Sequence, residues 1–105
     1  MTSHMKETFG EYIKLLRTKN KFTLTQLAAQ LELDSANLSK IENGKRNFDE
    51  KKLSKLAAIF DLDTKELRNE YISDKMAKHI YQMDCSTELL KVAEEKAEYR
   101  KTLKK

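Results

Sequence analysis

The fold that we predict for this chain follows from the segment TLTQLAAQLELDSANLSKIENG, residues 23–44. Thr23 and Gln26 have the spacing of a capping box, in which each side chain bonds the other residue's backbone N–H at a helix start. Asp34 is a good N-cap for a second helix. The second helix is expected to stop at Asn43-Gly44, where Gly44 suits the left-handed conformation that ends helices. The segment therefore predicts two short helices joined by a tight turn.

Apolar residues in this segment recur at helical spacing and mark the inner face of each helix. Leu27, Ala28 and Leu31 share one side of the first helix, and Leu38 and Ile41 share one side of the second. The small side chain of Ala28 allows the backbone of another helix to approach closely. Polar residues occupy the remaining sides, so one face of each helix is expected to stay in solvent.

The same periodicity extends in both directions along the chain. A first helix over about residues 6–19 is expected to bury the face made of Phe9, Tyr12, Ile13 and Leu16. Asn47 or Asp49 would cap a fourth helix, whose buried stripe is Leu53, Leu56, Ala57 and Phe60. Asp63 and Glu66 have capping-box spacing and open a fifth helix that contains Leu67 and Tyr71.

Two further helical segments follow the fifth helix. Residues 71–83 have a helical pattern, and we expect Met76 and Met83 to belong to the core. Ser86 or Thr87 would cap a last helix that runs from about residue 88 to 103.

Composition agrees with an all-α protein of one small domain plus a helical addition. The chain has 105 residues, of which 39% are hydrophobic and 36% charged, with two glycines and no proline. Without those helix breakers long segments can stay helical, and few stretches alternate at the period of a strand. The opening Ser3-His4-Met5 has the look of a cloning remnant and is left out of the fold prediction.

Charge and cysteine content restrict the function further. The net charge is +4, and residues 1–46 hold eight Lys or Arg against five Asp or Glu, whereas residues 47–105 hold thirteen against twelve. The first part is therefore the better candidate for an electrostatic contact with nucleic acid. Cys85 is the only cysteine, which rules out an internal disulfide and suits a reducing cytoplasm. No apolar run approaches the length of a membrane span, and no signal peptide is apparent, so we expect a cytoplasmic protein with no membrane partner.

The spacing of Leu27-Ala28, Leu31, Leu33, Leu38, Ile41 and Glu42-Asn43-Gly44 resembles the phage-repressor-like family of helix-turn-helix transcriptional regulators, the XRE or Cro/CI type. The resemblance covers about residues 7–72 and extends to Leu53-Ser54-Lys55-Leu56-Ala57 and Leu62-Asp63. It implies a five-helix DNA-binding domain over residues 6–72, followed by a C-terminal helical extension over residues 73–105.

The resemblance also implies a set of site residues. Arg17, late in the first helix, would pair with Glu42 and tie that helix to the end of the third. The third helix would enter the major groove, which admits one α-helix. Its expected base-reading residues are Ser35, Ala36, Asn37 and Lys40. The expected phosphate contacts, which set register and affinity, are Lys21, Thr25, Gln26, Asn43, Lys45 and Arg46.

Two positions depart from the family pattern. Leu24 begins the second helix where many members have a Gln that grips a phosphate, so Thr25 and Lys21 are expected to replace that contact. Glu32 occupies the turn position that often holds Gly in the left-handed region, which implies a slightly altered turn.

The last helix carries a heptad-like seam in steps of three and four, with Lys96 in its middle. The expected dimerisation residues are Leu89, Val92, Tyr99 and Leu103. The alternative is that this helix packs back on its own domain.

We therefore predict a sequence-specific DNA-binding regulator, a repressor or autoregulator, that binds a double-stranded operator as a homodimer. The alternative is a protein-interaction module, such as an antitoxin, whose main partner is another protein. An enzyme is not expected, because no nucleophile, base and orienting residue are placed together, and His4 and His79 lie far apart. The spacing of His, Cys and Asp predicts no metal site, and we expect no cofactor.

Overall fold

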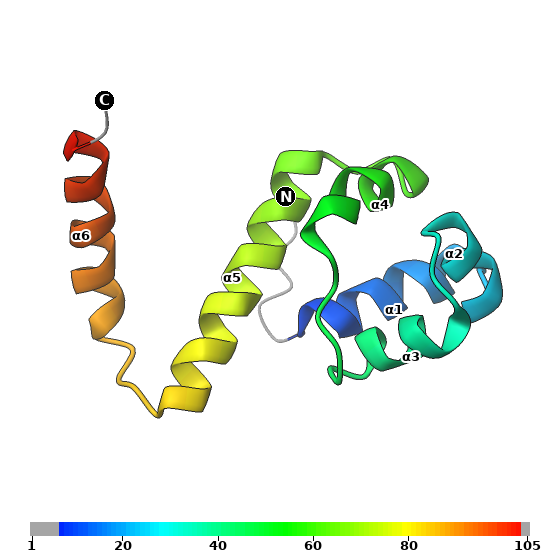
Figure 1. The fold of residues 1–105 in the computed structure, drawn as a ribbon, viewed down its shortest axis with the longest axis horizontal. Helices are drawn as coiled ribbons and strands as arrows, with labels where there is room; N and C mark the ends of the chain where they lie inside the picture. Colours follow the sequence, from blue (N-terminus) through cyan, green and yellow to red (C-terminus); the bar gives the residue numbers. More distant parts are fainter. Residues whose placement is uncertain (1–6, 104–105) are drawn as a thin grey trace. The chain divides into compact units, whose positions relative to one another are not determined.

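The computed structural model describes residues 7–103, which form six α-helices and one short 3-10 helix and contain no strand (Figure 1). In chain order these are α1 (Phe9–Lys19), α2 (Leu24–Gln30), α3 (Ser35–Glu42), η1 (Glu50–Lys52), α4 (Leu53–Ile59), α5 (Thr64–Met83) and α6 (Leu89–Leu103). The expected cloning remnant and residue 6, where the first helix was predicted to begin, lie outside the described residues. The all-α prediction is confirmed.

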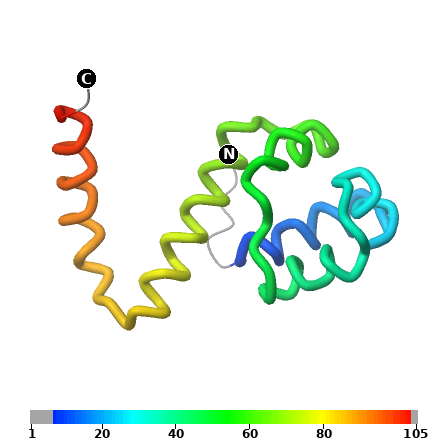
Figure 2. Tube along the Cα trace, in the orientation of Figure 1, coloured from blue at the N-terminus to red at the C-terminus, as the bar shows by residue number. Residues whose placement is uncertain are grey.

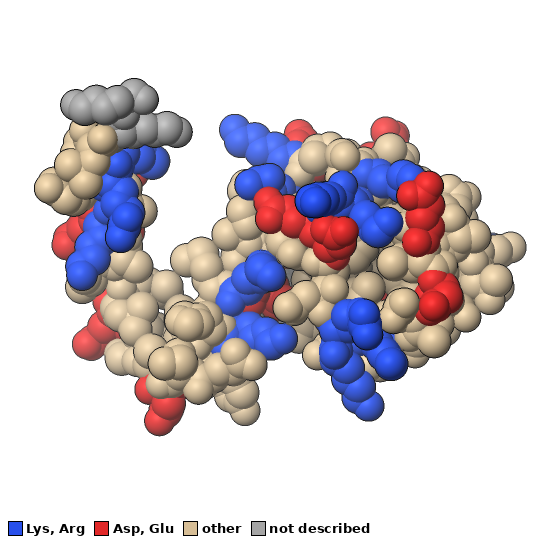
Figure 3. Space-filling view, in the orientation of Figure 1, with Lys and Arg blue, Asp and Glu red and all other residues tan. Residues whose placement is uncertain are grey.

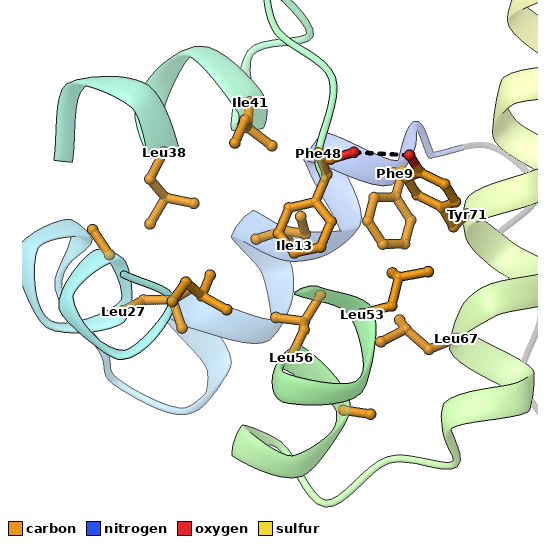
Figure 4. Close-up of a cluster of buried hydrophobic side chains, with 13 residues drawn as sticks. Phe9, Ile13, Leu27, Leu38, Ile41, Phe48, Leu53, Leu56, Leu67 and Tyr71 are labelled. Carbon is orange, nitrogen blue, oxygen red and sulfur yellow. Dashed lines mark hydrogen bonds between the residues drawn. The ribbon is translucent and has the colours of Figure 1, made fainter. Parts of the chain in front are cut away.

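The chain divides into two compact units, and the boundary lies between Asp74 and Lys75, within α5. The first unit contains the hydrophobic core, to which α1 to α5 and the loop before η1 all contribute (Figure 4). Its largest fully buried side chains are Ile13, Leu27, Leu31, Leu38 and Leu56. Burying each of these contributes about 1.5–3 kcal/mol, so packing of the apolar stripes holds the short helices in place.

Aromatic residues close one end of this core. The Phe9 ring lies 5.2 Å from that of Tyr71 in an edge-on arrangement and 5.8 Å from that of Phe48. The Tyr71 hydroxyl donates to the Phe48 carbonyl oxygen at 2.8 Å, the bond drawn in Figure 4. The loop before η1 is thereby fixed between the first and fifth helices.

Helix α1 approaches the end of α3 unusually closely, and Gly10 makes this possible. A Cβ atom at position 10 would clash with the Ile41 carbonyl oxygen and lie 3.0 Å from that of Glu42. Any larger residue would push the two helices apart, because both carbonyls belong to the backbone.

Four helices end at a residue other than glycine in the left-handed conformation. These residues are Lys21, Glu32, Asp61 and Asp84, with φ between 55° and 63°. In each case the next residue's N–H bonds a carbonyl five positions back, which is the outer bond of the Schellman motif. The hydrogen bonds and the apolar contacts of the following residues hold a conformation that L-residues adopt only at a cost.

The region after residue 60 differs in part from the sequence prediction. Helix α5 continues without a break from Thr64 to Met83, whereas the sequence pattern predicted a further helical segment over residues 71–83 after the fifth helix (Figure 2). The prediction that Met76 and Met83 belong to the core is wrong, because their exposed fractions are 48% and 61%. The core belongs to the first unit, and these side chains follow the last buried residue of α5, Tyr71.

Helix α6 begins at Leu89, after Ser86 accepts a hydrogen bond from the Glu88 backbone N–H at 3.1 Å. No residue of α6 is buried. In residues 7–103 no helix is both long and apolar enough to cross a membrane.

Candidate nucleic-acid interface

The candidate interface is built on α2, the turn after it and α3. Thr23 and Gln26 form the predicted capping box, with bonds of 2.9 and 3.1 Å between each side chain and the other residue's backbone. The Asp34 carboxylate accepts from the Asn37 N–H at 2.7 Å and so fixes where α3 begins. Both helix starts are therefore determined by side chains within the segment itself.

The turn between α2 and α3 is shaped by Glu32, which takes φ of 60°. The Glu32 N–H bonds the Ala29 carbonyl at 3.1 Å, and the Leu33 N–H bonds the Ala28 carbonyl at 2.8 Å. These two bonds complete a Schellman motif without glycine. The turn geometry that glycine usually provides is thus present here with a charged residue.

One face of α3 is anchored and the other is open. Leu38 and Ile41 point into the core with exposed fractions of 0% and 4%. Ser35, Ala36 and Lys40 are exposed, and Asn37 is half-buried. The four expected base-reading residues thus share the first turns of one helix, and three of them are exposed and available to a ligand.

The end of α3 presents a cationic loop. Gly44 takes φ of 77°, and the Lys45 N–H bonds the Lys40 carbonyl at 2.8 Å in a further Schellman motif, this one with glycine. Asn43, Lys45 and Arg46 are exposed. Figure 3 shows a group of Lys and Arg side chains at the lower edge of the view, where the end of α3 and this loop lie in Figure 1. An anionic ligand lying along α3 would meet these side chains.

The start of α2 supplies further exposed polar groups. Lys21, Thr25 and Gln26 are all exposed. The Gln26 side-chain oxygen is used by the capping box, which leaves its amide N–H groups to donate outward. At the other end of the site, Asn43 already donates one amide N–H to the Ser39 carbonyl at 2.9 Å.

Arg17 and Glu42 meet in a two-pronged ion pair. The distances are 2.7 Å from Nε to Oε2 and 3.1 Å from Nη2 to Oε1. The side chains are 11% and 4% exposed, and Nη1 of Arg17 also donates to the Phe22 carbonyl at 3.1 Å. The pair joins the end of α1 to the end of α3, so it helps to fix the angle at which α3 is presented.

Sequence reasoning missed two residues that position this site. Gly10 permits the close contact between α1 and α3, and Phe48 anchors the loop that leaves α3. Gly10 lies inside a helical pattern, where glycine lowers helix stability. Its presence there was the one local signal that another part of the chain packs closely against this helix. The role of Phe48 depends on residues far away in the chain and left no local signal.

Other chemistry has little support in the described residues. Within residues 7–103 no three His, Cys, Asp or Glu side chains are placed to hold a metal ion. Cys85 is a free, exposed thiol. Burial raises the pKa of Tyr12, and the negative charges of Glu70, Glu66 and Glu7 raise it further.

Comparison with known proteins gives a consistent result. Residues 10–72 match the family model described as a helix-turn-helix domain. The HTH-type transcriptional repressor RghR of Bacillus subtilis (strain 168) is 48% identical over 40 residues, which are 38% of this chain and 30% of that protein. The uncharacterized HTH-type transcriptional regulator RghRB of the same organism is 40% identical over 60 residues, 56% of this chain and 43% of that protein.

The control protein C.MunI of a Mycoplasma species is 43% identical over 65 residues, 60% of this chain and 86% of that protein. The chain thus spans less than half the length of the two Bacillus relatives and most of the control protein. The matched family is not one of enzymes, in agreement with the sequence prediction. Since the family model covers more than half of the chain and the α2–turn–α3 geometry is present, the chain belongs to the XRE-type helix-turn-helix family.

Proposed function

We propose that this chain is a cytoplasmic transcriptional regulator, a repressor or autoregulator, that binds operator DNA as a homodimer. The observation that carries the proposal is the open polar face of α3, seated on a rigid core and followed by a cationic loop. Relatives with the same domain are named a transcriptional repressor, a transcriptional regulator and a control protein.

In this proposal the first turns of α3 read base edges in the major groove. The Asn37 amide suits adenine, Lys40 can donate to O6 or N7 of guanine, and the Ala36 methyl can contact that of thymine. Ser35 can donate to or accept from either kind of base. The exposure of Ser35, Ala36 and Lys40 supports these roles, and half-buried Asn37 keeps part of its side chain accessible.

Phosphate contacts would flank the reading helix on both sides. Lys45 and Arg46 follow α3, while Lys21, Thr25 and Gln26 surround the start of α2. Asn43 would use its second amide N–H, since the first is bonded to Ser39. Such contacts fix register and give binding its salt dependence, because each neutralised phosphate releases counterions.

A homodimer is proposed because one recognition helix covers too few base pairs for useful specificity. Two-fold pairing doubles the contact and matches a palindromic site. The extension over residues 73–105 would form the contact between copies through Leu89, Val92, Tyr99 and Leu103. The exposed fractions of Val92, Tyr99 and Leu103, 50%, 63% and 56%, support an apolar surface that a partner covers.

The test is binding to a duplex from the DNA just upstream of the protein's own gene, against a scrambled duplex, at two salt concentrations. We expect a preference for the native duplex that persists at higher salt, with two protomers per site. Lys40→Ala should reduce that preference, whereas Arg46→Ala should weaken binding to both duplexes alike. Equal, steeply salt-sensitive binding to both duplexes would contradict an autoregulator.

The exposed apolar side chains of α6 also favour a second candidate, a module that docks a different protein. That candidate predicts a chain that stays monomeric, binds no duplex with preference, and keeps its partner after Lys40→Ala and Arg46→Ala.

A further inference from the structure

The charged residues of α6 are distributed unevenly around its apolar seam. With Leu89, Lys96 and Leu103 at a positions and Val92 and Tyr99 at d positions, the helix spans two heptads. The residues farthest from the seam then carry both signs of charge, namely Lys91, Glu94, Glu98 and Lys101. The e and g positions of a heptad flank the seam. In α6 the charged residues at these positions are Glu95, at a g position, and Arg100, at an e position.

Glu95 and Arg100 are exposed and take part in no ion pair within the described chain. By contrast, Lys101 on the outer side lies 3.4 Å from Glu98 of the same helix. The flanking charges are therefore available to a second helix, and they have opposite signs.

From this pattern we infer that α6 pairs in parallel with α6 of a second copy, and that Glu95 of each copy meets Arg100 of the other. In a parallel pair a g residue faces the e residue five positions later on the partner, and 95 and 100 differ by five. In an antiparallel pair g faces g and e faces e, so neither Glu95 nor Arg100 gains an opposite charge. The charges thus select both the partner and its orientation. The inference rests on the proposed homodimer and specifies its contact.

Lys96 limits the strength of this contact. At a central a position it would face its own copy across a parallel pair, which costs stability but favours one register and oligomeric state. Two heptads with one lysine in the seam are short for a stable coiled coil. We therefore expect a weak dimer, with a Kd in about the micromolar range.

The test uses two charge reversals in the full chain, Glu95→Lys and Arg100→Glu. Each variant alone turns two attractive pairs of the homodimer into two repulsive ones, so its self-association should be about tenfold weaker. In a mixture of the two variants, the lysine introduced at position 95 of one copy meets the glutamate introduced at position 100 of the other. The unchanged Arg100 of the first copy meets the unchanged Glu95 of the second. Both pairs are then attractive, so we expect mixed dimers well above the statistical proportion, with wild-type affinity.

Matched controls carry the same charge changes on the outer side of α6, Glu94→Lys and Lys101→Glu. They should self-associate within about twofold of wild type and mix statistically, because those positions lie away from the seam. Helix content by circular dichroism shows whether all four variants keep α6, and sedimentation equilibrium measures each Kd.

The possible failures are distinguishable. A wild-type chain that stays monomeric at every concentration, with and without operator DNA, overturns both the proposed homodimer and this inference. A wild-type dimer whose affinity and mixing do not respond to Glu95→Lys and Arg100→Glu overturns the parallel α6 contact and leaves the homodimer standing on another surface.

Discussion

Replacing Arg17 with methionine tests how strongly the buried ion pair holds α1 to α3. The substitution keeps much of the side-chain volume and removes the cation, leaving the Glu42 carboxylate at 4% exposure. Breaking a buried pair by removing one partner costs about 3–5 kcal/mol, because the remaining charge is desolvated and unpaired. Arg17 is 11% exposed, so some water can reach the site, and we expect a loss of about 3 kcal/mol. For a domain of this size that lowers Tm by about 12–24 °C.

The assay is urea unfolding followed by circular dichroism, with Arg68→Met as the matched control. Arg68 lies 3.0 Å from Glu50, but the two side chains are 55% and 49% exposed, so its loss should cost at most about 1 kcal/mol. The double variant Arg17→Met/Glu42→Leu should recover much of the loss, because no buried charge remains. If Arg17→Met destabilises no more than Arg68→Met, the pair does not hold these helices together.

Three further predictions concern the backbone and the titration of the first unit. Gly10→Ala should destabilise by about 1–3 kcal/mol and weaken duplex binding, because the new methyl group displaces α3; an unchanged Tm would contradict the close contact. Glu32→Gly should stabilise by about 0.5–1 kcal/mol in urea unfolding, since glycine adopts the left-handed turn without strain and the exposed Glu32–Lys55 ion pair that is lost contributes little; a net loss of stability would contradict this. The pKa of Tyr12 is raised above its ordinary 10.0 by burial and neighbouring carboxylates, so its contribution to stability is complete below that value and is lost as pH rises through the folded pKa. Stability above about pH 10 should therefore fall less in Tyr12→Phe than in wild type, and equal slopes of stability against pH would contradict this.

The starts of α2 and α3 were predictable because their signals are local, whereas α4 begins at Leu53 without a side-chain cap and the predicted Asp49 caps η1 instead. Thr23 with Gln26, and Asp34 with the N–H of Asn37, need only residues three positions apart, and these bonds are present. Apolar spacing predicted the separate helices, the family resemblance implied the DNA-binding domain, and residues 10–72 match a helix-turn-helix family model.

Contacts between distant residues were harder to predict. The packing of Phe48 against Phe9 and Tyr71 joins residues 23 to 39 positions apart, so no short window of sequence contains it. Met76 and Met83 were misplaced because hydrophobicity shows that a side chain prefers burial but not which surface buries it. The roles of the α3 residues in reading DNA stay predictions.

Whether α3 binds DNA can be measured by following backbone amide chemical shifts during titration with a short duplex that contains the preferred site. If α3 reads DNA, the largest changes should lie at Ser35 to Lys40 and continue through Lys45 and Arg46, with smaller changes around Lys21 and Thr25. Changes confined to α6, or spread evenly over all exposed lysines, would show that the open face of α3 is not the DNA-binding surface.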